Sequence, residues 1–227
     1  MTSRQYRRHG PPRIRWAVLV DISVPLHPGL PHWPRQAAFG RDVTSSVNRG
    51  DRSTVSTLTV GAHGGTHFDA PVHFVKGGAT AEALDLEACV GPAYVADMSH
   101  VEGHIRGEDL EAAGIPEGTV RLLSRTRNSG WSGDSAFRED FCAYDASGAE
   151  WVVSRGIRLL GIDYLSIEPF GSGDKGNPTH RTLLEAGIVV LEGLDLAHAE
   201  QGEWELIALP LRVVDGDGAP GRAILRR

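Results

Sequence analysis

The stretch from His63 to His73 limits the local fold of this chain more than any other, because it places three histidines and one aspartate around a glycine pair and a proline. On an α-helix His63 and His67 would share a face, but Asp69 would point roughly 200° away from His67. The glycines and the proline also disfavour a regular helix. The stretch is therefore predicted to be a strand end or a loop.

All four polar groups stand at odd positions in the sequence. In an extended backbone, alternate side chains share a face, so His63, His67, Asp69 and His73 are expected to project in the same direction. A single histidine is more often a surface or core residue than a ligand. Four such donors at this spacing nevertheless predict a hydrolytic metal site. Nitrogen and oxygen donors without thiolates suit zinc, manganese or a similar divalent ion.

The composition fits one large globular domain. The chain has 227 residues, 41% of them apolar, and no apolar run long enough to span a membrane. Residues 1–15 are predicted to form a flexible basic tail, and residues 16–227 to form the domain. The arginines of the tail do not indicate a nucleic-acid partner, because the net charge is −6 and the isoelectric point about 5.9.

Two features bear on the cellular compartment. The apolar run at residues 16–20 reaches Asp21 too soon to form the core of a signal peptide, so export is not expected. Cys89 and Cys142 lie far apart and lack metal-finger or redox spacing, so they are interpreted as buried thiols of a reducing compartment. The expected location is the cytoplasm.

Strands, turns and short helices alternate along the chain, without internal repeats. Runs rich in β-branched and apolar residues predict the strands, and the run at residues 54–60 leads directly into the histidine cluster. The alternation predicts a mixed α/β domain. Strands are predicted at residues 16–23, 54–60, 93–97, 120–124, 157–162 and 187–191, helices at 107–113 and 148–154, and a C-terminal hairpin that joins 204–214 to 222–225.

Three further polar motifs have simpler interpretations. Asp163, at the end of a predicted strand, either orients a ligand histidine or caps the strand, and both alternatives stay open. The Asp-Gly-Asp-Gly sequence at residues 215–218 lacks the length and the distal glutamate of a calcium loop, so it is interpreted as a hairpin turn. The glycine-rich residues 171–178 do not match a phosphate loop and are interpreted as a mobile segment that leads to His180.

Several motifs together resemble one known family. The histidine cluster is followed by Gly161-Ile162-Asp163 with Ser166, then by His180 and, twelve positions later, by Glu192. This pattern resembles the cyclase family of metal-dependent amidohydrolases, which includes bacterial kynurenine formamidases and isatin hydrolases. The resemblance also takes in residues 21–26, 205–211 and 219–220, and so covers nearly everything after residue 15.

The resemblance implies a single-domain swivelling β/β/α fold with a mixed sheet and a site for two divalent metal ions, with zinc expected and manganese as the alternative. In formamidase-like members, the positions that match His63, His67 and Asp69 hold one ion. Those that match Asp69, His180 and Glu192 hold the other. Asp69 and Glu192 would then bridge the two ions.

The resemblance also implies roles for residues around the metals. His73 matches the acid/base residue of the family, and Trp33 matches an aromatic residue that contacts the substrate. Arg35 departs from the pattern, because many relatives have glycine after the Trp-Pro pair. Members of the family commonly form dimers or larger assemblies, so a homo-oligomer is expected.

The expected reaction is hydrolysis of the carbon–nitrogen bond of an arylformamide or a cyclic amide, a small-molecule substrate, by water that the metal ions activate. His73 is expected to pass a proton to the leaving nitrogen. Ser166 and Cys142 have no activating neighbours in the sequence, which disfavours a covalent acyl-enzyme.

Fold and family do not fix the substrate, which stays open between N-formylkynurenine, isatin and other acyl compounds. Phe74, Trp131 and Phe170 are candidates for lining an aromatic pocket beside Trp33. Residues 125–131 resemble the broader family more than the dedicated formamidases. Two other classes of function also fit the chain: a metal-stabilised binding protein without turnover, and a cyclase or lactonase-type enzyme that acts on another small acyl substrate.

Overall fold

The computed structural model describes residues 18–227. The expected tail at residues 1–15 lies outside the described residues, as do residues 16 and 17 of the first predicted strand. None of the helices in the described part of the chain is long and apolar enough to cross a membrane. The strands are β1 (Leu19–Asp21), β2 (Gly40–Ser45), β3 (Val55–Thr59), β4 (His67–Asp69), β5 (Val90–Asp97), β6 (Arg121–Arg125), β7 (Leu159–Ile162), β8 (Val189–Glu192), β9 (Gly202–Pro210) and β10 (Gly218–Arg226), and the α-helices are α1 (Leu86–Cys89), α2 (Gly107–Ala112), α3 (Ala146–Ser154) and α4 (Pro178–Glu185).

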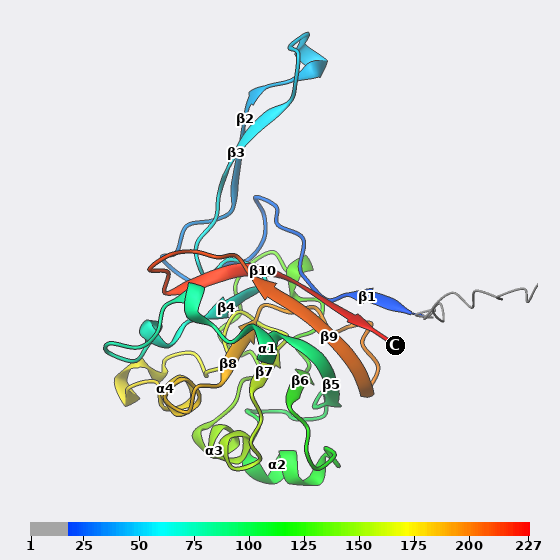
Figure 1. Cartoon of the computed structure of the whole chain (residues 1–227), viewed down its shortest axis with the longest axis vertical. Coiled ribbons are helices and arrows are strands. Elements are labelled where there is room, and N and C mark those ends of the chain that lie inside the picture. Colours follow the sequence, from blue (N-terminus) through cyan, green and yellow to red (C-terminus); the bar gives the residue numbers. More distant parts are fainter. Residues whose placement is uncertain (1–17) are drawn as a thin grey trace, which may run out of the picture.

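Eight of these strands form one mixed sheet in the order β1-β10-β4-β8-β7-β6-β5-β9 (Figure 1). The four strands from β5 to β8 are parallel, whereas β4 runs antiparallel to β8, and β9 antiparallel to β5. The start of β10 pairs with β4 and the rest of it pairs with β9, so the sheet closes on itself. This is the mixed α/β fold that the sequence predicts.

Strands β7 and β8 are buried along their whole length, and β6 is buried at all but its last residue, as expected for parallel strands that are covered on both faces. On β6, Leu122 packs in a cluster with Leu110 of α2 and Leu183 of α4. Its neighbour Leu123 points to the opposite face and packs in a cluster with Phe68 of β4. The helices therefore cover the outer face of the parallel strands, with α2 and α3 at the lower edge of Figure 1, and the second cluster fills the closed sheet.

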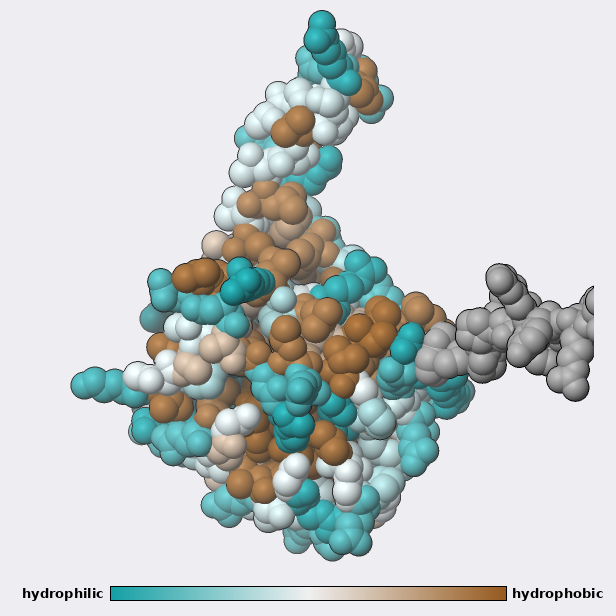
Figure 2. All heavy atoms as spheres, in the orientation of Figure 1, coloured by the Kyte–Doolittle hydropathy of each residue, from teal (hydrophilic) through white to brown (hydrophobic). Residues whose placement is uncertain are grey.

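Residues 40–59 form a hairpin that stands away from the body of the molecule, and we call this hairpin the arm (Figure 1). Its two strands, β2 and β3, pair with each other in a separate sheet. None of its residues is buried. Figure 2 shows apolar side chains along the arm and around its base, and Val47, Val55 and Leu58 are the large apolar residues that the arm exposes.

Most of the predicted elements occur in the structure. The strands predicted at 93–97, 120–124, 157–162 and 187–191 are β5 to β8, and the two predicted helices are α2 and α3. The strand predicted at 54–60 is β3, which lies in the arm. The sequence did not predict β2 and α4, because β2 is polar and solvent-exposed and α4 buries Thr179 and His180 beside its leucines. Strand β2 therefore lacks an apolar alternation, and the apolar signal of α4 is limited to two adjacent leucines, Leu183 and Leu184.

Candidate metal centre

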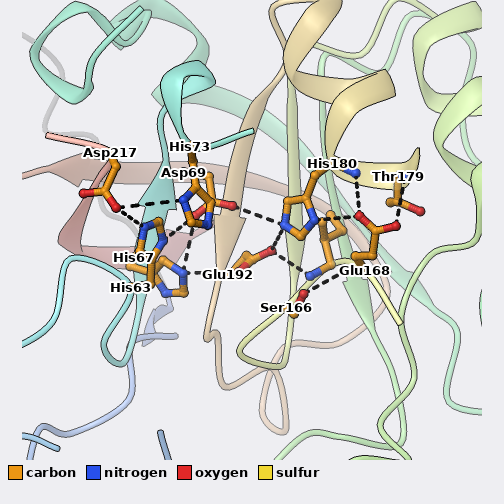
Figure 3. A network of polar contacts seen from close by, with 11 residues as sticks. His63, His67, Asp69, His73, Ser166, Glu168, Thr179, His180, Glu192 and Asp217 are labelled. Carbon is orange, nitrogen blue, oxygen red and sulfur yellow. Dashed lines mark hydrogen bonds and ion pairs between the residues drawn. The ribbon is translucent and has the colours of Figure 1, made fainter. Parts of the chain in front are cut away.

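Strand β4 carries two of the predicted ligands on one face. His67 and Asp69 alternate with Phe68, so the histidine and the carboxylate face the site while Phe68 packs in the core. Across the antiparallel pair β4–β8, His67 stands opposite Glu192. Its Nε2 lies 3.2 Å from Oε2 of Glu192, so the ladder itself brings these groups together (Figure 3).

His63 and His73 do not lie on this strand, so the expectation of one extended segment with all four residues on a face is wrong. His63 lies in the turn before β4, and His73 ends the short 3-10 turn that follows it. The glycine pair and the proline interrupt the extended backbone on either side. Both rings still reach the site. Nδ1 of His63 lies 2.8 Å from Oδ1 of Asp69, and the His63 and His73 rings stack at a centroid distance of 4.0 Å.

Helix α4 brings His180 to the other side of the same carboxylates (Figure 3). Its Nε2 lies 3.3 Å from Oδ2 of Asp69 and 3.2 Å from Oε1 of Glu192. Glu192 also accepts a hydrogen bond of 2.6 Å from the backbone N–H of Ile167. The structure therefore brings together all six residues singled out in the sequence: His63, His67, Asp69, His73, His180 and Glu192.

The donor set fits divalent metal ions. Within residues 18–227, the buried atoms Nε2 of His67 and Oδ2 of Asp69 have no hydrogen-bond partner. A buried polar atom in that state costs about 1–3 kcal/mol, which makes it rare in a native protein. Ligand atoms of His67, Asp69 and Glu192 lie within 4.8 Å of one another, and so do those of His63, Asp69 and His73. Imidazole and carboxylate donors at such distances suit zinc or manganese.

Neighbouring groups determine which ring nitrogen faces the site. Nδ1 of His67 lies 2.9 Å from the carbonyl oxygen of Gly65. A carbonyl oxygen only accepts, so Nδ1 carries the proton and Nε2 presents its lone pair to the centre. In His63 the two nitrogens exchange these roles. Its Nε2 lies 3.1 Å from the acceptor Oδ2 of Asp217, and its Nδ1 faces Asp69 and the centre. An oxygen acceptor on the far nitrogen is usual for histidines that bind metal.

Buried opposite charges stabilise one another in this centre. Burial disfavours the cationic form of His63, but the hydrogen bond and the charge of Asp69 outweigh it and raise the pKa of His63 to about 9. Burial would raise the pKa of Asp69, yet the neighbouring His180 and His63 hold it well below its usual range. Burial lowers the pKa of His73. Divalent ions would take over the role of the histidine protons as countercharge to the carboxylates.

These residues line a cavity of about 320 Å³. Trp33, Phe74 and Leu165 supply its apolar lining. Phe170 does not line the cavity but packs against Trp33 at a ring distance of 5.5 Å, and Trp131 is buried in the core. Of the three further aromatic candidates, Phe74 alone thus lines the cavity. Its size and its mixture of apolar and polar walls suit a small molecule with an aromatic ring.

Arg35, beside the Trp-Pro pair, has a φ angle of 71°. This left-handed region is the one that glycine adopts most easily. Arg35 thus adopts a backbone conformation that glycine would adopt at lower cost.

Sequence reasoning missed two carboxylates at the centre. Glu168 lies 2.8 Å from Nδ1 of His180, and Asp217 lies 3.1 Å from Nε2 of His63. Asp217 belongs to the turn that was interpreted as purely structural, so that interpretation is incomplete. Only their positions in the sequence could have indicated these two carboxylates. Glu168 follows Ser166 by two residues, and Asp217 precedes the segment at 219–220 that resembles the family.

Asp163 contacts no histidine of the centre. Its carboxylate accepts hydrogen bonds from the backbone N–H of Thr126, at 2.7 Å, and from the hydroxyls of Thr126 and Ser129. Asp163 therefore has the structural role of a cap at the end of its strand and does not orient a ligand histidine. Thr126 and Ser129, both in the segment 125–131, thus hold this buried carboxylate.

Neither candidate for a covalent nucleophile is activated. The hydroxyl of Ser166 accepts a hydrogen bond of 3.1 Å from the backbone N–H of Glu168. Cys142 is buried, and burial raises the pKa of its thiol to about 12. A thiol with so high a pKa is a poor nucleophile at neutral pH.

The sequence matches the model of the "Putative cyclase" family over residues 20–169. The chain belongs to the cyclase family. A kynurenine formamidase of Bacillus cereus is 39% identical to it over 207 residues, which are 91% of this chain and 96% of that protein. The predicted family is thereby confirmed.

Two solved structures resemble this member of the cyclase family. A "predicted metal-dependent hydrolase" from Bacillus stearothermophilus is 34% identical, with a TM-score of 0.78 over 92% of this chain and 98% of the other. Isatin hydrolase A from Ralstonia solanacearum is 25% identical, with a TM-score of 0.78 over 92% and 91% of the two chains. These similarities confirm the predicted fold class.

Proposed function

We propose that this cyclase-family protein is a metal-dependent hydrolase that cleaves the carbon–nitrogen bond of an arylformamide or a cyclic amide. The observation that carries the proposal is that the buried carboxylates of Asp69 and Glu192 and four histidines meet at one cavity (Figure 3). Among the described residues, two buried atoms of this group that could bind metal, Nε2 of His67 and Oδ2 of Asp69, have no hydrogen-bond partner. The similarity to a kynurenine formamidase and to an isatin hydrolase supports this class of reaction.

We assign two divalent ions to the centre. One would be held by His63, His67 and Asp69. The other would be held by Asp69, His180 and Glu192. When bound, such ions lower the pKa of water toward neutrality and polarise an acyl oxygen. Zinc is our first assignment and manganese the second, because both accept mixed imidazole and carboxylate donors.

His73 is the proposed acid/base residue. It lines the cavity, its ring stacks on that of His63, and its Nδ1 lies 3.9 Å from Oδ2 of Asp217. Burial lowers the pKa of His73, so its ring is neutral at pH 7. A neutral imidazole can accept a proton from the attacking water and deliver it to the leaving nitrogen.

We propose that the aryl group of the substrate lies against Trp33 and Phe74. Trp33 is held by aromatic neighbours, Phe137 at 5.0 Å and Phe170 at 5.5 Å between ring centroids. A wall fixed in this way can bind a flat ring at little cost in side-chain entropy. N-formylkynurenine and isatin both offer such a ring beside a cleavable amide bond.

The test is a substrate screen on protein of known metal content. Metal-free protein, reconstituted with zinc or with manganese, would be incubated with formylated anilines, N-formylkynurenine, isatin and lactones. We expect amide hydrolysis that is lost on chelation and restored by metal. Bound metal without any turnover would favour a metal-stabilised binding protein, and turnover of lactones alone a lactonase. Full amide hydrolysis by the metal-free protein would contradict the proposal.

We also propose that the chain forms a homo-oligomer through the arm. A two-stranded hairpin is at best marginally stable alone in water, and this one exposes Val47, Val55 and Leu58. The body of the same chain exposes Leu209 and Leu211 beside a shallow groove. A second copy carries both surfaces, as a two-fold interface requires.

Light scattering on the purified protein tests the assembly. We expect a dimer or larger species that dissociates when Val55→Asp and Leu58→Asp are combined. A wild-type protein that is monomeric at all concentrations would contradict it.

The remaining assignments concern location and partners. We propose a cytoplasmic enzyme, since Cys89 and Cys142 are buried as free thiols in the structure and a reducing compartment keeps thiols in that state. We propose a small-molecule substrate rather than a nucleic acid or a membrane surface, because the cavity has a volume of about 320 Å³ and the net charge of −6 disfavours contact with polyanions. Fractionation of the native host and a nucleic-acid binding assay test these two points.

A further inference from the structure

We propose that Glu168 is the positioning residue of His180. Its carboxylate sets which nitrogen of the His180 ring faces the centre and, through the same oxygens, fixes the start of helix α4. The inference rests on the proposed metal-dependent function, because it assigns Glu168 an effect on metal binding.

Glu168 accepts three hydrogen bonds from two consecutive residues (Figure 3). Its Oε2 accepts from the backbone N–H of His180 at 3.1 Å and lies 2.8 Å from Nδ1 of the same residue. Its Oε1 accepts from the backbone N–H of Thr179 at 3.2 Å. Only 3% of the residue is exposed. These contacts tie the main chain and the side chain of His180 to a single buried group.

The two backbone donors belong to the first turn of α4, where N–H groups have no partner within the helix. The residue that precedes the helix, Asn177, makes no capping hydrogen bond with its side chain and has a φ angle of 52°. Glu168 therefore serves as the cap from a distant segment, and the helix dipole favours its negative charge there. The position of this carboxylate determines where α4 begins and where His180 stands.

The same carboxylate determines the tautomer. The carboxylate of Glu168 is the acceptor in all three of its contacts, because its oxygens face two backbone N–H groups and the ring nitrogen Nδ1 of His180. Nδ1 of His180 then carries a proton, so Nε2 alone can present a lone pair. Nε2 faces Oδ2 of Asp69 and Oε1 of Glu192. A carboxylate behind a histidine orients the ring and strengthens the nitrogen as a metal ligand.

Phe74 holds the ring from its face. The Phe74 and His180 rings stack at 4.2 Å between centroids with an angle of 26° between their planes. The ring is thus restrained in its plane by Glu168 and across its plane by Phe74. A half-turn of the ring that would bring Nδ1 to the centre breaks the hydrogen bond to Glu168 and passes through orientations that Phe74 obstructs.

Loss of Glu168 also removes a helix cap, so the test needs a control that loses a cap alone. Asp145 is the N-cap of α3, where Oδ1 accepts from the backbone N–H of Gly148 at 3.0 Å and from the hydroxyl of Ser147 at 2.7 Å. None of these partners belongs to the metal centre. Asp145→Ala therefore reproduces the loss of a carboxylate cap without touching a histidine ligand.

The experiment compares Glu168→Gln, Asp145→Ala and wild type in the full chain. Zinc affinity would be measured by chelator competition, the ligand field of bound Co²⁺ by absorption, and the Tm of the metal-free proteins by circular dichroism. We expect Glu168→Gln to weaken binding of one zinc ion by about 10- to 100-fold and to alter the Co²⁺ spectrum. We expect Asp145→Ala to lower Tm and to leave zinc affinity and the spectrum unchanged.

A second variant, Glu168→Asp, keeps a negative charge at the helix terminus if the glutamine variant does not fold. Its shorter side chain cannot span Nδ1 and both N–H groups, so it too should bind zinc more weakly. Wild-type affinity in either Glu168 variant, or an equal loss in Asp145→Ala, would overturn the inference. Wild-type protein that binds no divalent ion would contradict the proposed function as well. Two bound ions in wild type with unchanged affinity in Glu168→Gln would contradict the role of Glu168 alone.

Discussion

His67 and Glu192 are direct partners across the antiparallel strands β4 and β8, with 3.2 Å between Nε2 and Oε2. On its other edge β4 pairs with β10, where Pro220 stands opposite His67. The shortest strand of the centre is thus held on both sides. This ladder fixes His67, Asp69 and Glu192, whereas turns and a helix deliver the other histidines. The strands should therefore supply the fixed part of the proposed metal site, and His63 and His180 should complete it from outside the sheet.

Glu192→Gln tests the strand part of the centre. The variant keeps the shape of the side chain but removes a buried negative charge that faces His67 and His180. We expect at least one metal ion to bind about 10-fold more weakly or worse, a large fall in hydrolysis, and a folded protein in excess metal. Elemental analysis and a hydrolysis assay measure both effects.

Glu205→Gln is the matched control, because Glu205 lies on β9 and pairs with Arg226 away from the cavity. It should keep both metal content and turnover. Full metal stoichiometry together with wild-type turnover in Glu192→Gln would exclude Glu192 as a bridging ligand.

His73→Ala separates proton transfer from metal binding. His73 is close enough to His63 and Asp69 to complete a ligand group with them, so both roles are geometrically open. If it transfers protons, kcat should fall by about two to four orders of magnitude while most of the metal stays bound. His198→Ala, at an exposed position, should change neither quantity. Loss of metal in proportion to kcat would make His73 a ligand instead.

The sequence predicts those parts of the structure whose residues carry local signals. β7 and β8 are short apolar runs that are buried along their whole length, and β5 and β6 each contain a shorter apolar core, so pattern alone locates them. The proposed ligands His63, His67 and Asp69 stand within seven positions, and any chain reversal at the glycine pair brings them near one another. Local chemistry is then enough to identify a metal site.

The contacts that complete the centre are long-range, and no local pattern reports them. Asp217 meets His63 across 154 positions, which requires β10 to close the sheet against β4. Glu168 meets His180 across 12 positions, which requires a helix that buries Thr179 and His180 in its first turn. The expectation of one extended segment through His73 failed because Pro71 starts a new turn, although the histidines converge all the same.

Metal affinity should depend steeply on pH. The pKa of His63 is raised to about 9 in the metal-free protein, so below pH 9 its ring is protonated and a metal ion must displace that proton. Apparent affinity should therefore rise by about tenfold per pH unit for each displaced proton as the pH increases toward 9. Chelator competition at several pH values, with proton release followed in weakly buffered solution, measures this. Affinity that is constant from pH 6.5 to 8.5 would show that His63 is neutral before metal binds.

Gly218→Ala tests whether the turn at 215–218 belongs to the centre. A Cβ atom at Gly218 would lie 2.6 Å from the ring of His63 and 2.8 Å from the carbonyl oxygen of Phe68, so the ring has to move. We expect a loss of about 1–3 kcal/mol in the free energy of unfolding and weaker binding of the ion assigned to His63. Gly103→Ala, where a Cβ meets no atom within 4 Å, should leave stability and metal affinity near wild type. Denaturant titration measures the stability of both variants, and chelator competition measures their metal affinity. Unchanged metal affinity in Gly218→Ala would show that this turn has a purely structural role.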